Sequence, residues 1–422
     1  MSAENRPQNI LIAISGGIAA YKVCEVVSTL AKSDPPHPPA QVRVVLTDAA
    51  QAFVSALTFA GLSRHRAYTD ADFWQANQDR PLHIELGEWA DLILLAPLTA
   101  NTLGKLTHGL ADNLLTNTIL ASTCPVLLAP AMNTDMWQQV SVQRNWAQLQ
   151  QDSRYHTVGP AAGRLACDRI GTGRMAPPQH ILNHLYSLLH SQGQRDLAGK
   201  HLLISTGGTR EYLDAVRFIG NPSTGRMGIA LAQAATHRGA RVTLVHGPLE
   251  PALYSHIPDA IQTLPAHSAA TMATTLEQQL PEADWVIMAA AVADVRPQQT
   301  VSSKLPKSQL PEQLPLETVP DIVAQLAAQR QPHQQLIGFA AQTGEIVAPA
   351  RAKLMRKGLN AIIANPIDQP NSGFGTDTNQ AIFLSSSGEQ TRLKTGSKLS
   401  IAHQILDCLV ETVSSTANMA SP

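Results

Sequence analysis

Short apolar segments rich in β-branched residues alternate with helical patterns along almost the whole chain, and this alternation runs through twice. Such alternation is typical of parallel sheets that helices cover on both faces. A polar stretch, Ser191–Gly199, separates the two passes. We therefore predict an α/β protein with two doubly wound, Rossmann-like domains, each built on a mainly parallel sheet. The predicted strands are Asn9–Ile14, Val42–Leu46, Leu92–Ala96 and Val126–Ala129 in the first half, and His201–Ser205, Val242–Val245, Trp285–Ala289, Leu336–Phe339 and Ala361–Ala364 in the second.

Helical periodicity occupies the segments between these strands and helps to define the expected domains. The chain has 422 residues, which is long for one hydrophobic core and comfortable for two. We expect domains at residues 1–190 and 200–413, joined by a linker at 191–199 and followed by a frayed tail at 414–422. The predicted helices are Ile18–Ala31, Ala49–Thr58, Thr102–Thr107, Asp135–Gln150, Met227–Arg238, Ser268–Gln279 and Glu345–Lys357.

The composition narrows the functional class. Charged residues make up only 15% of the chain, so burial of surface between subunits is a reasonable expectation. The net charge of −1 argues against a non-specific nucleic-acid binder and against a basic membrane-surface protein. We find no signal-peptide core in Met1–Gln8, and Asn113–Thr134 contains two prolines and reads as helix, turn and buried strand. The four cysteines form no CxxC pair, and we expect a cytoplasmic protein.

Each half opens with an apolar strand followed by two glycines, Gly16-Gly17 in one and Gly207-Gly208 in the other. Glycines at such a turn let the backbone approach an anion, and the following helix offers free N–H groups at its N-terminus. By pattern alone, either each half binds a phosphate-bearing ligand or these are simply tight strand–helix turns. Neither turn has the full GxGxxG fingerprint, so an NAD-dependent dehydrogenase is disfavoured.

Several short strings in the first half are more specific in combination than any of them is alone. In chain order they are Ser15–Lys22 (SGGIAAYK), His83–Leu86 (HIEL), Ala96–Asn101 (APLTAN), Gly109–Thr116 (GLADNLLT) and Pro130–Asn133 (PAMN). Over residues 8–190 the chain resembles the homo-oligomeric flavin-containing cysteine decarboxylases, and the phosphopantothenoylcysteine decarboxylases in particular. The resemblance implies a flavodoxin-like domain that uses FMN, because the departing carboxylate needs the electron sink that a flavin provides.

The same resemblance implies roles for individual residues. His83 matches a histidine that handles a proton, a role that suits imidazole, although a lone histidine of this kind is more often packed in a core. Asn133 matches an asparagine that holds the substrate carboxylate, and it also suits a helix cap. Cys167 matches a cysteine of a substrate-covering flap that donates a proton when the ene-thiol is reduced. The positions matching FMN contacts are Ser15, Gly16, Thr47, Phe53, Thr99, Ala100 and Asn101, of which Phe53 is equally well explained as a core aromatic.

The flap sequence departs from the family at one position, where Asp168 stands in place of the usual glycine. A carboxylate beside a thiol raises the pKa of that thiol and keeps it protonated for donation. The change also removes a flexible residue from a mobile flap. One alternative is therefore a ligase fused to a flavin-binding but catalytically weak domain, which Asp168 and Arg169 favour. A second alternative, a regulatory flavoprotein that inhibits a related decarboxylase, is disfavoured because the reactive positions of both halves are present.

Strings in the second half cover nearly all of it. They are Ser205–Glu211 (STGGTRE), Asp214–Asn221 (DAVRFIGN), Ser223–Gly228 (STGRMG), Ala290–Asp294 (AAVAD), Pro320–Val323 (PDIV) and Gly338–Thr343 (GFAAQT). From about Leu197 onward the chain resembles phosphopantothenate–cysteine ligase of the bacterial type, which uses CTP. The resemblance implies that the carboxylate of 4'-phosphopantothenate attacks the α-phosphate of CTP, and that the amine of cysteine then displaces CMP. Such chemistry depends on positioning and on neutralising charge, normally with Mg²⁺ and lysines.

Two residues of this half match catalytic positions. Asn221 matches an asparagine that handles the acyl-nucleotide, and Lys304 matches the first lysine of a KxKK string. Pro306 replaces one lysine of that string, which stiffens the loop and deletes a backbone donor. The metal ligands are not predicted beyond the phosphates of CTP. The positions matching nucleotide contacts are Met288, Ala289, Ala290, Asp294, Lys304, Pro320, Asp321, Ile322, Val323, Phe339, Lys353 and Lys357, although Lys353 and Lys357 also fit an exposed basic helix face.

The resemblance also implies partners and an assembly. The small-molecule partners are 4'-phosphopantothenate, cysteine and CTP, and the ligase product feeds the N-terminal domain. Flavin sites built between subunits imply trimeric flavin domains, and ligase domains that pair as dimers extend these to a homo-oligomer such as a dodecamer. Neither a nucleic acid nor a membrane is expected as a partner.

Overall fold

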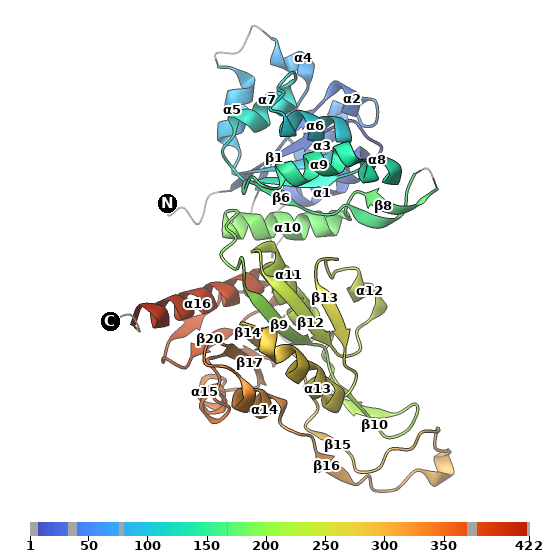
Figure 1. Cartoon of the computed structure of the whole chain (residues 1–422), viewed down its shortest axis with the longest axis vertical. Helices are drawn as coiled ribbons and strands as arrows, with labels where there is room; N and C mark the ends of the chain where they lie inside the picture. Colours follow the sequence, from blue (N-terminus) through green and yellow to red (C-terminus); the bar gives the residue numbers. More distant parts are fainter. Residues whose placement is uncertain (1–6, 33–39, 76–79, 167, 369–377, 420–422) are drawn as a thin grey trace. The chain divides into compact units, whose positions relative to one another are not determined.

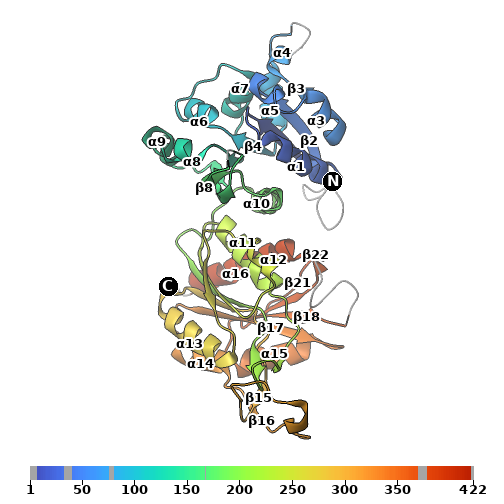
Figure 2. The same ribbon diagram turned by 90° about the vertical axis from the view of Figure 1, so that its right-hand side faces the viewer.

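The structure is a computed structural model that describes residues 7–32, 40–75, 80–166, 168–368 and 378–419. The chain divides into two compact units, Met1–Gln194 and Arg195–Pro422 (Figures 1 and 2). No helix within the described ranges is long and apolar enough to cross a membrane.

A parallel six-stranded sheet forms the centre of the first unit, with strand order β3-β2-β1-β4-β5-β6. The order reverses between β1 and β4, as in other doubly wound sheets. The predicted fold class is confirmed, and the predicted strands correspond to β1, β2, β4 and β5. The strands are β1 (Gln8–Ile14), β2 (Ala40–Leu46), β3 (Ala67–Tyr68), β4 (Leu92–Leu98), β5 (Val126–Pro130) and β6 (Tyr155–Thr157), and a separate antiparallel pair is β7 (Ala161–Arg164) with β8 (Ile170–Arg174).

Helices surround this sheet. They are α1 (Ala20–Lys32), α2 (Asp48–Gln51), α3 (Ala56–Ser63), α4 (Asp70–Phe73), α5 (Leu82–Trp89), α6 (Ala100–Thr107), α7 (Leu114–Ala121), α8 (Thr134–Gln138), α9 (Val140–Leu149) and α10 (Pro178–Ser191). The predicted helix Ala49–Thr58 is wrong in its continuity, because the Ser55 side chain accepts the Thr58 N–H and starts α3 as a new helix. The predicted helix Asp135–Gln150 is also divided, since Gln139 is extended between α8 and α9.

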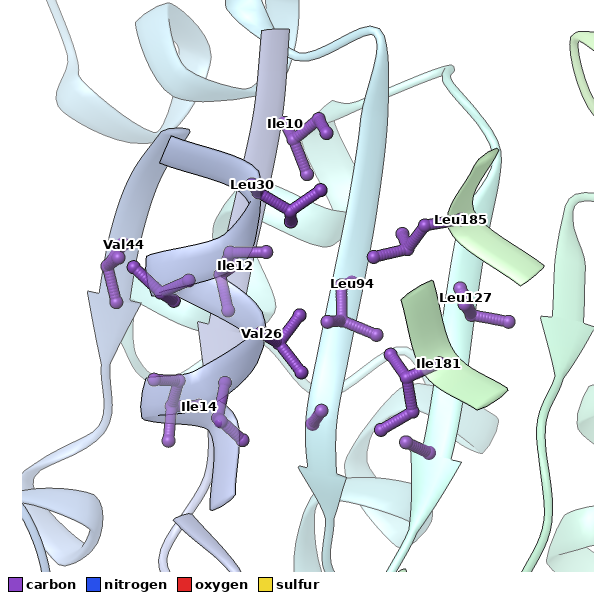
Figure 3. Close-up of a cluster of buried hydrophobic side chains, with 14 of the residues drawn as sticks. Ile10, Ile12, Ile14, Val26, Leu30, Val44, Leu94, Leu127, Ile181 and Leu185 are labelled. Atoms are coloured by element: carbon purple, nitrogen blue, oxygen red, sulfur yellow. The ribbon is translucent and has the colours of Figure 1, made fainter. Parts of the chain in front are cut away.

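The alternation of side chains along β1 produces two apolar layers. Ile10, Ile12 and Ile14 point to one face and pack against α1 and α10 (Figure 3), whereas Leu11 and Ala13 belong to the cluster on the other face. All five side chains are at most 1% exposed. Burying each large aliphatic side chain contributes roughly 1.5–3 kcal/mol. The strands can therefore hold the loops at their ends in fixed positions.

The sheet of the second unit has eight strands in the order β13-β12-β9-β14-β17-β18-β20-β21. Neighbours from β13 to β18 are parallel, and β20 and β21 add an antiparallel edge. The order reverses between β9 and β14. All the strands predicted for this half are confirmed. The strands of the sheet are β9 (His201–Thr206), β12 (Arg241–His246), β13 (Gln262–Pro265), β14 (Trp285–Met288), β17 (Gln335–Gln342), β18 (Ala361–Pro366), β20 (Ile382–Ser385) and β21 (Gln390–Arg392).

The helices of the second unit confirm the three that were predicted and add others. They are α11 (Arg226–His237), α12 (Pro251–Tyr254), α13 (Ala269–Gln279), α14 (Ile322–Gln329), α15 (Val347–Arg356) and α16 (Lys398–Met419), with short 3₁₀ segments η2 (Leu280–Glu282) and η3 (Lys307–Gln309). Residues 414–419, expected in a frayed tail, are helical because α16 continues to Met419. The first turns of α16 pack against the rest of the unit, because Ile401, Ile405 and Leu409 are almost fully buried.

Three small antiparallel pairs stand beside the main sheet of the second unit. They are β10 (Arg210–Tyr212) with β11 (Phe218–Gly220), β15 (Val295–Pro297) with β16 (Leu316–Thr318), and β19 (Thr378–Asn379) with β22 (Gly396–Ser397). The β10 and β15–β16 segments lie together at one end of this unit, away from α16 (Figure 1). This end carries the loop that contains Lys304.

Candidate active sites

The first cavity, of about 1030 Å³, is lined by residues that follow β1 and β4, where the strand order of the first sheet reverses. Ligands commonly bind at such a point of a parallel sheet. Ser15 is 1% exposed and its hydroxyl donates to the Pro97 carbonyl at 2.6 Å. The Thr99 N–H donates back to Ser15 Oγ at 3.2 Å. Ser15 thus lies beneath the cavity and joins the Gly16-Gly17 turn to the start of α6.

Gly16 and Thr47 bring a second strand–helix junction to this cavity. A Cβ at Gly16 would come within 2.5 Å of the Ala49 Cβ and 2.8 Å of the Ala49 carbonyl carbon, so only glycine fits. The Thr47 hydroxyl accepts the Ala50 N–H at 3.3 Å and caps α2. Six of the residues singled out from the sequence line the cavity: Gly16, Thr47, Thr99, Ala100, Asn101 and Asn133.

The structure is compatible with both roles that the sequence analysis considers for Asn133, a helix cap and a ligand of the substrate carboxylate. Its Oδ1 accepts the Asp135 N–H at 2.8 Å and so caps α8. The same side chain lines the cavity. A helix cap restricts the rotamer of an asparagine, so the amide has a fixed orientation toward a ligand.

Cationic side chains that the sequence analysis did not single out also line this cavity. They include Lys22 of α1, Arg164 of β7 and Arg174 of β8. Burial lowers the pKa of the Lys22 ammonium below its ordinary value, and the charge of Arg174 lowers it further. An anion bound nearby favours the charged form of both groups. This side of the cavity therefore suits a phosphate or a carboxylate.

His83 and Phe53 do not line this cavity within the part of the chain that the structure describes. The His83 ring lies at the start of α5, edge-on to Phe73 with 5.4 Å between ring centroids. Its Nδ1 is buried and has no hydrogen-bond partner among the described residues. Phe53 is 48% exposed, so it is not a core aromatic. Cys167 lies outside the described residues.

The turn that links β7 to β8 accommodates the residue that departs from the family. Asp168 has a φ of 63°, in the left-handed region that favours glycine and that aspartate tolerates better than most residues. Its carboxylate lies 3.5 Å from Arg164 Nε, and its N–H donates to the Leu165 carbonyl at 3.0 Å. Arg169 forms an ion pair with Asp135 of α8. Asp168 and Arg169 thus each face an opposite charge on a neighbouring element at the surface.

The second cavity, of about 650 Å³, lies where the order of the second sheet reverses, beside the ends of β9 and β14. The Ala290 N–H donates to Ser205 Oγ at 3.2 Å, and the Ala291 N–H donates to the Gly207 carbonyl at 2.8 Å. These bonds join the two strand ends. Every predicted nucleotide-contact position except Lys304 lines the cavity, namely Met288, Ala289, Ala290, Asp294, Pro320, Asp321, Ile322, Val323, Phe339, Lys353 and Lys357.

Lys353 of α15 and Lys357, which directly follows the end of that helix, line this cavity and are partly buried. The Lys353 ammonium donates to the Phe339 carbonyl at 3.0 Å, and Lys357 forms an ion pair with Asp321. Burial lowers the pKa of Lys353, the charge of Arg356 lowers it further, and the charge of Asp294 opposes the change. An exposed basic helix face therefore does not describe these side chains. Their positive charge suits the phosphates of a nucleotide.

Asn221 lines the same cavity and is positioned through the Gly207-Gly208 turn. Its Nδ2 donates to the Val292 carbonyl at 3.0 Å. A Cβ at Gly208 would come within 2.6 Å of the Asn221 carbonyl oxygen, so the close contact requires glycine. This turn therefore serves to place Asn221.

Lys304 is exposed and does not line the cavity within the described part of its own chain. It lies in the loop between β15 and η3. No group of three or more His, Cys, Asp or Glu side chains arranged to hold a metal ion occurs within the described ranges.

Two family models match the chain. The model described as Flavoprotein matches residues 1–190, and the model described as DNA/pantothenate metabolism flavoprotein C-terminal domain matches residues 197–413. Among curated relatives, the coenzyme A biosynthesis bifunctional protein CoaBC of Bacillus subtilis is 41% identical over 399 residues, covering 94% of this chain and 96% of the relative. The CoaBC protein of Mycobacterium tuberculosis is 39% identical over 417 residues, covering 96% of each.

Solved structures resemble each unit in turn. The C-terminal domain of a coenzyme A biosynthesis bifunctional protein CoaBC covers 53% of this chain and all of its own, with 32% identity and a TM-score of 0.44. The FMN binding protein AtHal3 covers 44% of this chain and 98% of its own, with 37% identity and a TM-score of 0.39.

Proposed function

This chain belongs to the family of coenzyme A biosynthesis bifunctional proteins, CoaBC, and we propose how its two cavities divide the chemistry of that family. The chain is a bifunctional enzyme of coenzyme A biosynthesis with a decarboxylase flavoprotein domain and a ligase domain. The assignment of the two sites rests on one observation. In each half, residues of the short strings that resemble the family line a separate cavity, which lies where the strand order of that half's sheet reverses.

FMN is the cofactor of the first cavity. The volume of the cavity, the close-packed backbone at Gly16 and the cations Lys22 and Arg174 fit a flavin that carries a phosphate. Gly16, Thr47 and Thr99–Asn101 would hold it. When bound, the flavin supplies the electron sink for loss of the carboxylate of 4'-phosphopantothenoylcysteine. The neutral amide of Asn133 binds this carboxylate without a competing charge, and the thiol of Cys167 donates a proton when the ene-thiol left by decarboxylation is reduced.

His83 reaches the flavin site of a neighbouring copy of the chain. It lies outside the cavity of its own chain, and its side chain is only partly buried within that chain. Three apolar side chains of the same unit are more than 80% exposed and provide surface for subunit contacts, namely Leu57, Val140 and Ile170. Trimeric flavin domains and paired ligase domains, as in a dodecamer, would close every site.

The decarboxylase domain is active and not merely a flavin-binding partner of the ligase. Asp168 and Arg169, the two residues that favour a weak domain, form ion pairs on the surface with Arg164 and Asp135. Asp168 also adopts the left-handed conformation that the usual glycine would supply. The substitution therefore preserves the shape of the turn.

The second cavity binds CTP and activates 4'-phosphopantothenate for attack by cysteine. Lys353 and Lys357 neutralise the phosphates, with Mg²⁺ carried on the nucleotide. The Asn221 amide holds the acyl-nucleotide, and Lys304 approaches the phosphates from its loop. Positively charged groups fixed in this way stabilise the charge that develops on the transferred phosphoryl group.

A single incubation tests both assignments. The purified protein is mixed with 4'-phosphopantothenate, cysteine, Mg²⁺ and CTP, and products are followed by mass spectrometry with the flavin absorbance recorded in parallel. We expect 4'-phosphopantetheine together with CMP and CO₂. Accumulation of 4'-phosphopantothenoylcysteine would leave the ligase intact and show that the first domain is the weak alternative. Equal turnover with ATP in place of CTP would contradict the nucleotide assignment.

The pKa of Lys353 predicts how CTP binding depends on pH. Because burial lowers this pKa, Lys353 loses its charge at a lower pH than an exposed lysine does. The KM for CTP should therefore rise over a range of pH that lies below the usual pKa of lysine, by roughly tenfold, as one charged contact to phosphate is lost. The variant Lys353→Arg, which stays charged over this range, should flatten the profile. An identical rise in the variant would show that another group titrates.

A further inference from the structure

Asp214 is a buried carboxylate that no step of the proposed chemistry uses. It lies in the loop between β10 and β11 and is 1% exposed. Its Oδ1 accepts the N–H groups of Val216 and Arg217 at 2.8 and 2.7 Å, which closes a local turn. Its Oδ2 accepts the Arg217 guanidinium at 2.5 Å and the Leu305 N–H at 3.2 Å. One oxygen therefore serves the turn, and the other reaches a distant loop.

That distant loop carries Lys304. Both backbone polar groups of the next residue, Leu305, are engaged, because its carbonyl accepts Arg217 Nη1 at 3.3 Å while its N–H donates to Asp214. Earlier in the same segment, the Val301 N–H donates to the Leu213 carbonyl at 3.0 Å. Pro306 then fixes the backbone on the other side of Leu305. The main chain beside Lys304 is thus held from two directions, and its long side chain retains freedom.

We propose that Asp214 is a positioning residue for ligation, which fixes the main chain beside Lys304 through Leu305, so that only the lysine side chain has to move from its exposed position to meet the nucleotide. The inference rests on the role of Lys304 in the proposed function. A loop ordered before the reaction supplies charge that is already oriented toward the transition state, and this raises kcat more than it tightens substrate binding.

The charge state of Asp214 agrees with this geometry. Burial alone would raise the pKa of this carboxyl, but the N–H groups of Arg217 and Val216 lower it. The Leu305 N–H and the Arg217 charge lower it further, to about 2. The carboxylate is therefore ionised at every pH at which the enzyme would be assayed. Its contribution to stability is lost only as the pH falls from about 4, the unfolded value, through the folded value.

The variant Asp214→Asn separates the two tasks of this side chain. The remaining oxygen can close the turn to Val216 and Arg217, but the amide nitrogen then faces the Leu305 N–H and the guanidinium, all of which are donors. We expect kcat for ligation to fall about 30-fold with the KM for CTP nearly unchanged, as charge-assisted hydrogen bonds are lost. Hydrogen exchange of residues 298–310 should accelerate in parallel, which measures the loop independently of activity.

A double-mutant cycle with Lys304→Ala distinguishes positioning from general destabilisation. If Asp214 acts through Lys304, Asp214→Asn should lower kcat by less than about twofold in the Lys304→Ala background. Equal losses in both backgrounds, or no loss in the wild-type background, would overturn the inference while leaving Lys304 catalytic. A silent Lys304→Ala would instead overturn the assignment of Lys304, and with it the inference.

Two controls guard against a folding defect. Decarboxylation of supplied 4'-phosphopantothenoylcysteine by the same full-length chain should be unchanged in Asp214→Asn. Asp284→Asn is the matched substitution, because its carboxylate also accepts a backbone N–H, that of His201 at 2.8 Å, at the opposite end of β9. That variant should ligate as the wild type does. Equal impairment of the two variants would contradict a specific role for Asp214.

Discussion

The variant His83→Asn should lose decarboxylation by about 10³-fold while ligation is unaffected. The amide has nearly the same shape and can still donate or accept a hydrogen bond, but it cannot transfer a proton near neutral pH. Decarboxylation is measured on supplied 4'-phosphopantothenoylcysteine and ligation on 4'-phosphopantothenate, cysteine and CTP. The flavin absorbance should persist, because the residues proposed to hold the flavin, Gly16, Thr47 and Thr99–Asn101, are unchanged in this variant. Loss of flavin together with activity would indicate a structural role.

Subunit mixing tests where His83 acts. Chains that carry His83→Asn and chains that carry Asn133→Asp should each be inactive in decarboxylation. When the two are expressed together, sites that combine wild-type His83 from one chain with wild-type Asn133 from another should restore about a quarter of the activity or more. This follows from the position of Asn133 in the cavity and of His83 outside it. An absence of complementation in verified mixed oligomers would place both residues of one site on one chain.

The fold was predictable from the sequence because its strands are buried on both faces. In β1 and β4 nearly every residue is apolar, and such runs stand out from the amphipathic helices between them. The sequence analysis did not predict the edge strands β3, β6 and β13. These strands are short, and they are defined by their hydrogen-bonded pairing with a neighbour instead of by a strong apolar pattern. The breaks near Ser55 and Gln139 were missed because a side-chain cap and one extended residue decide them locally.

The candidate sites were predictable where residues follow one another along the chain. Segments such as Thr99–Asn101 and Pro320–Val323 line their cavities as contiguous strings. Pairings between distant segments were not predictable. Asp214 and Leu305 meet only because β10 and β15, each part of an antiparallel pair, lie side by side. Lys22 of α1 and Arg174 of β8 line the same cavity although they are far apart in the sequence. Propensity and periodicity describe neighbours in sequence, and such contacts depend on tertiary structure.

In the ligase domain, Asn221→Asp should have the largest effect, lowering ligation by about 10²–10³-fold without changing decarboxylation. The Asn221 amide nitrogen donates to the Val292 carbonyl at 3.0 Å and lies 3.4 Å from the Ala291 carbonyl oxygen. A carboxylate at this position would face both carbonyl oxygens without a donor, and it would add negative charge beside the phosphates of the nucleotide. Repulsion thus acts on both the resting side chain and the bound acyl-nucleotide.

A matched control separates this repulsion from a general effect of introducing aspartate. Asn360→Asp makes the same chemical change in the same domain, but Asn360 Oδ1 accepts the Leu336 N–H at 2.8 Å and the Arg330 guanidinium, and a carboxylate accepts both equally well. This variant should therefore ligate normally. Ligation is followed by release of pyrophosphate and by formation of 4'-phosphopantothenoylcysteine, so that the impaired half-reaction is identified. If Asn221→Asp released pyrophosphate and formed 4'-phosphopantothenoylcysteine normally, Asn221 would have no role in ligation. The Gly207-Gly208 turn would then have to serve the site in some way other than by positioning Asn221.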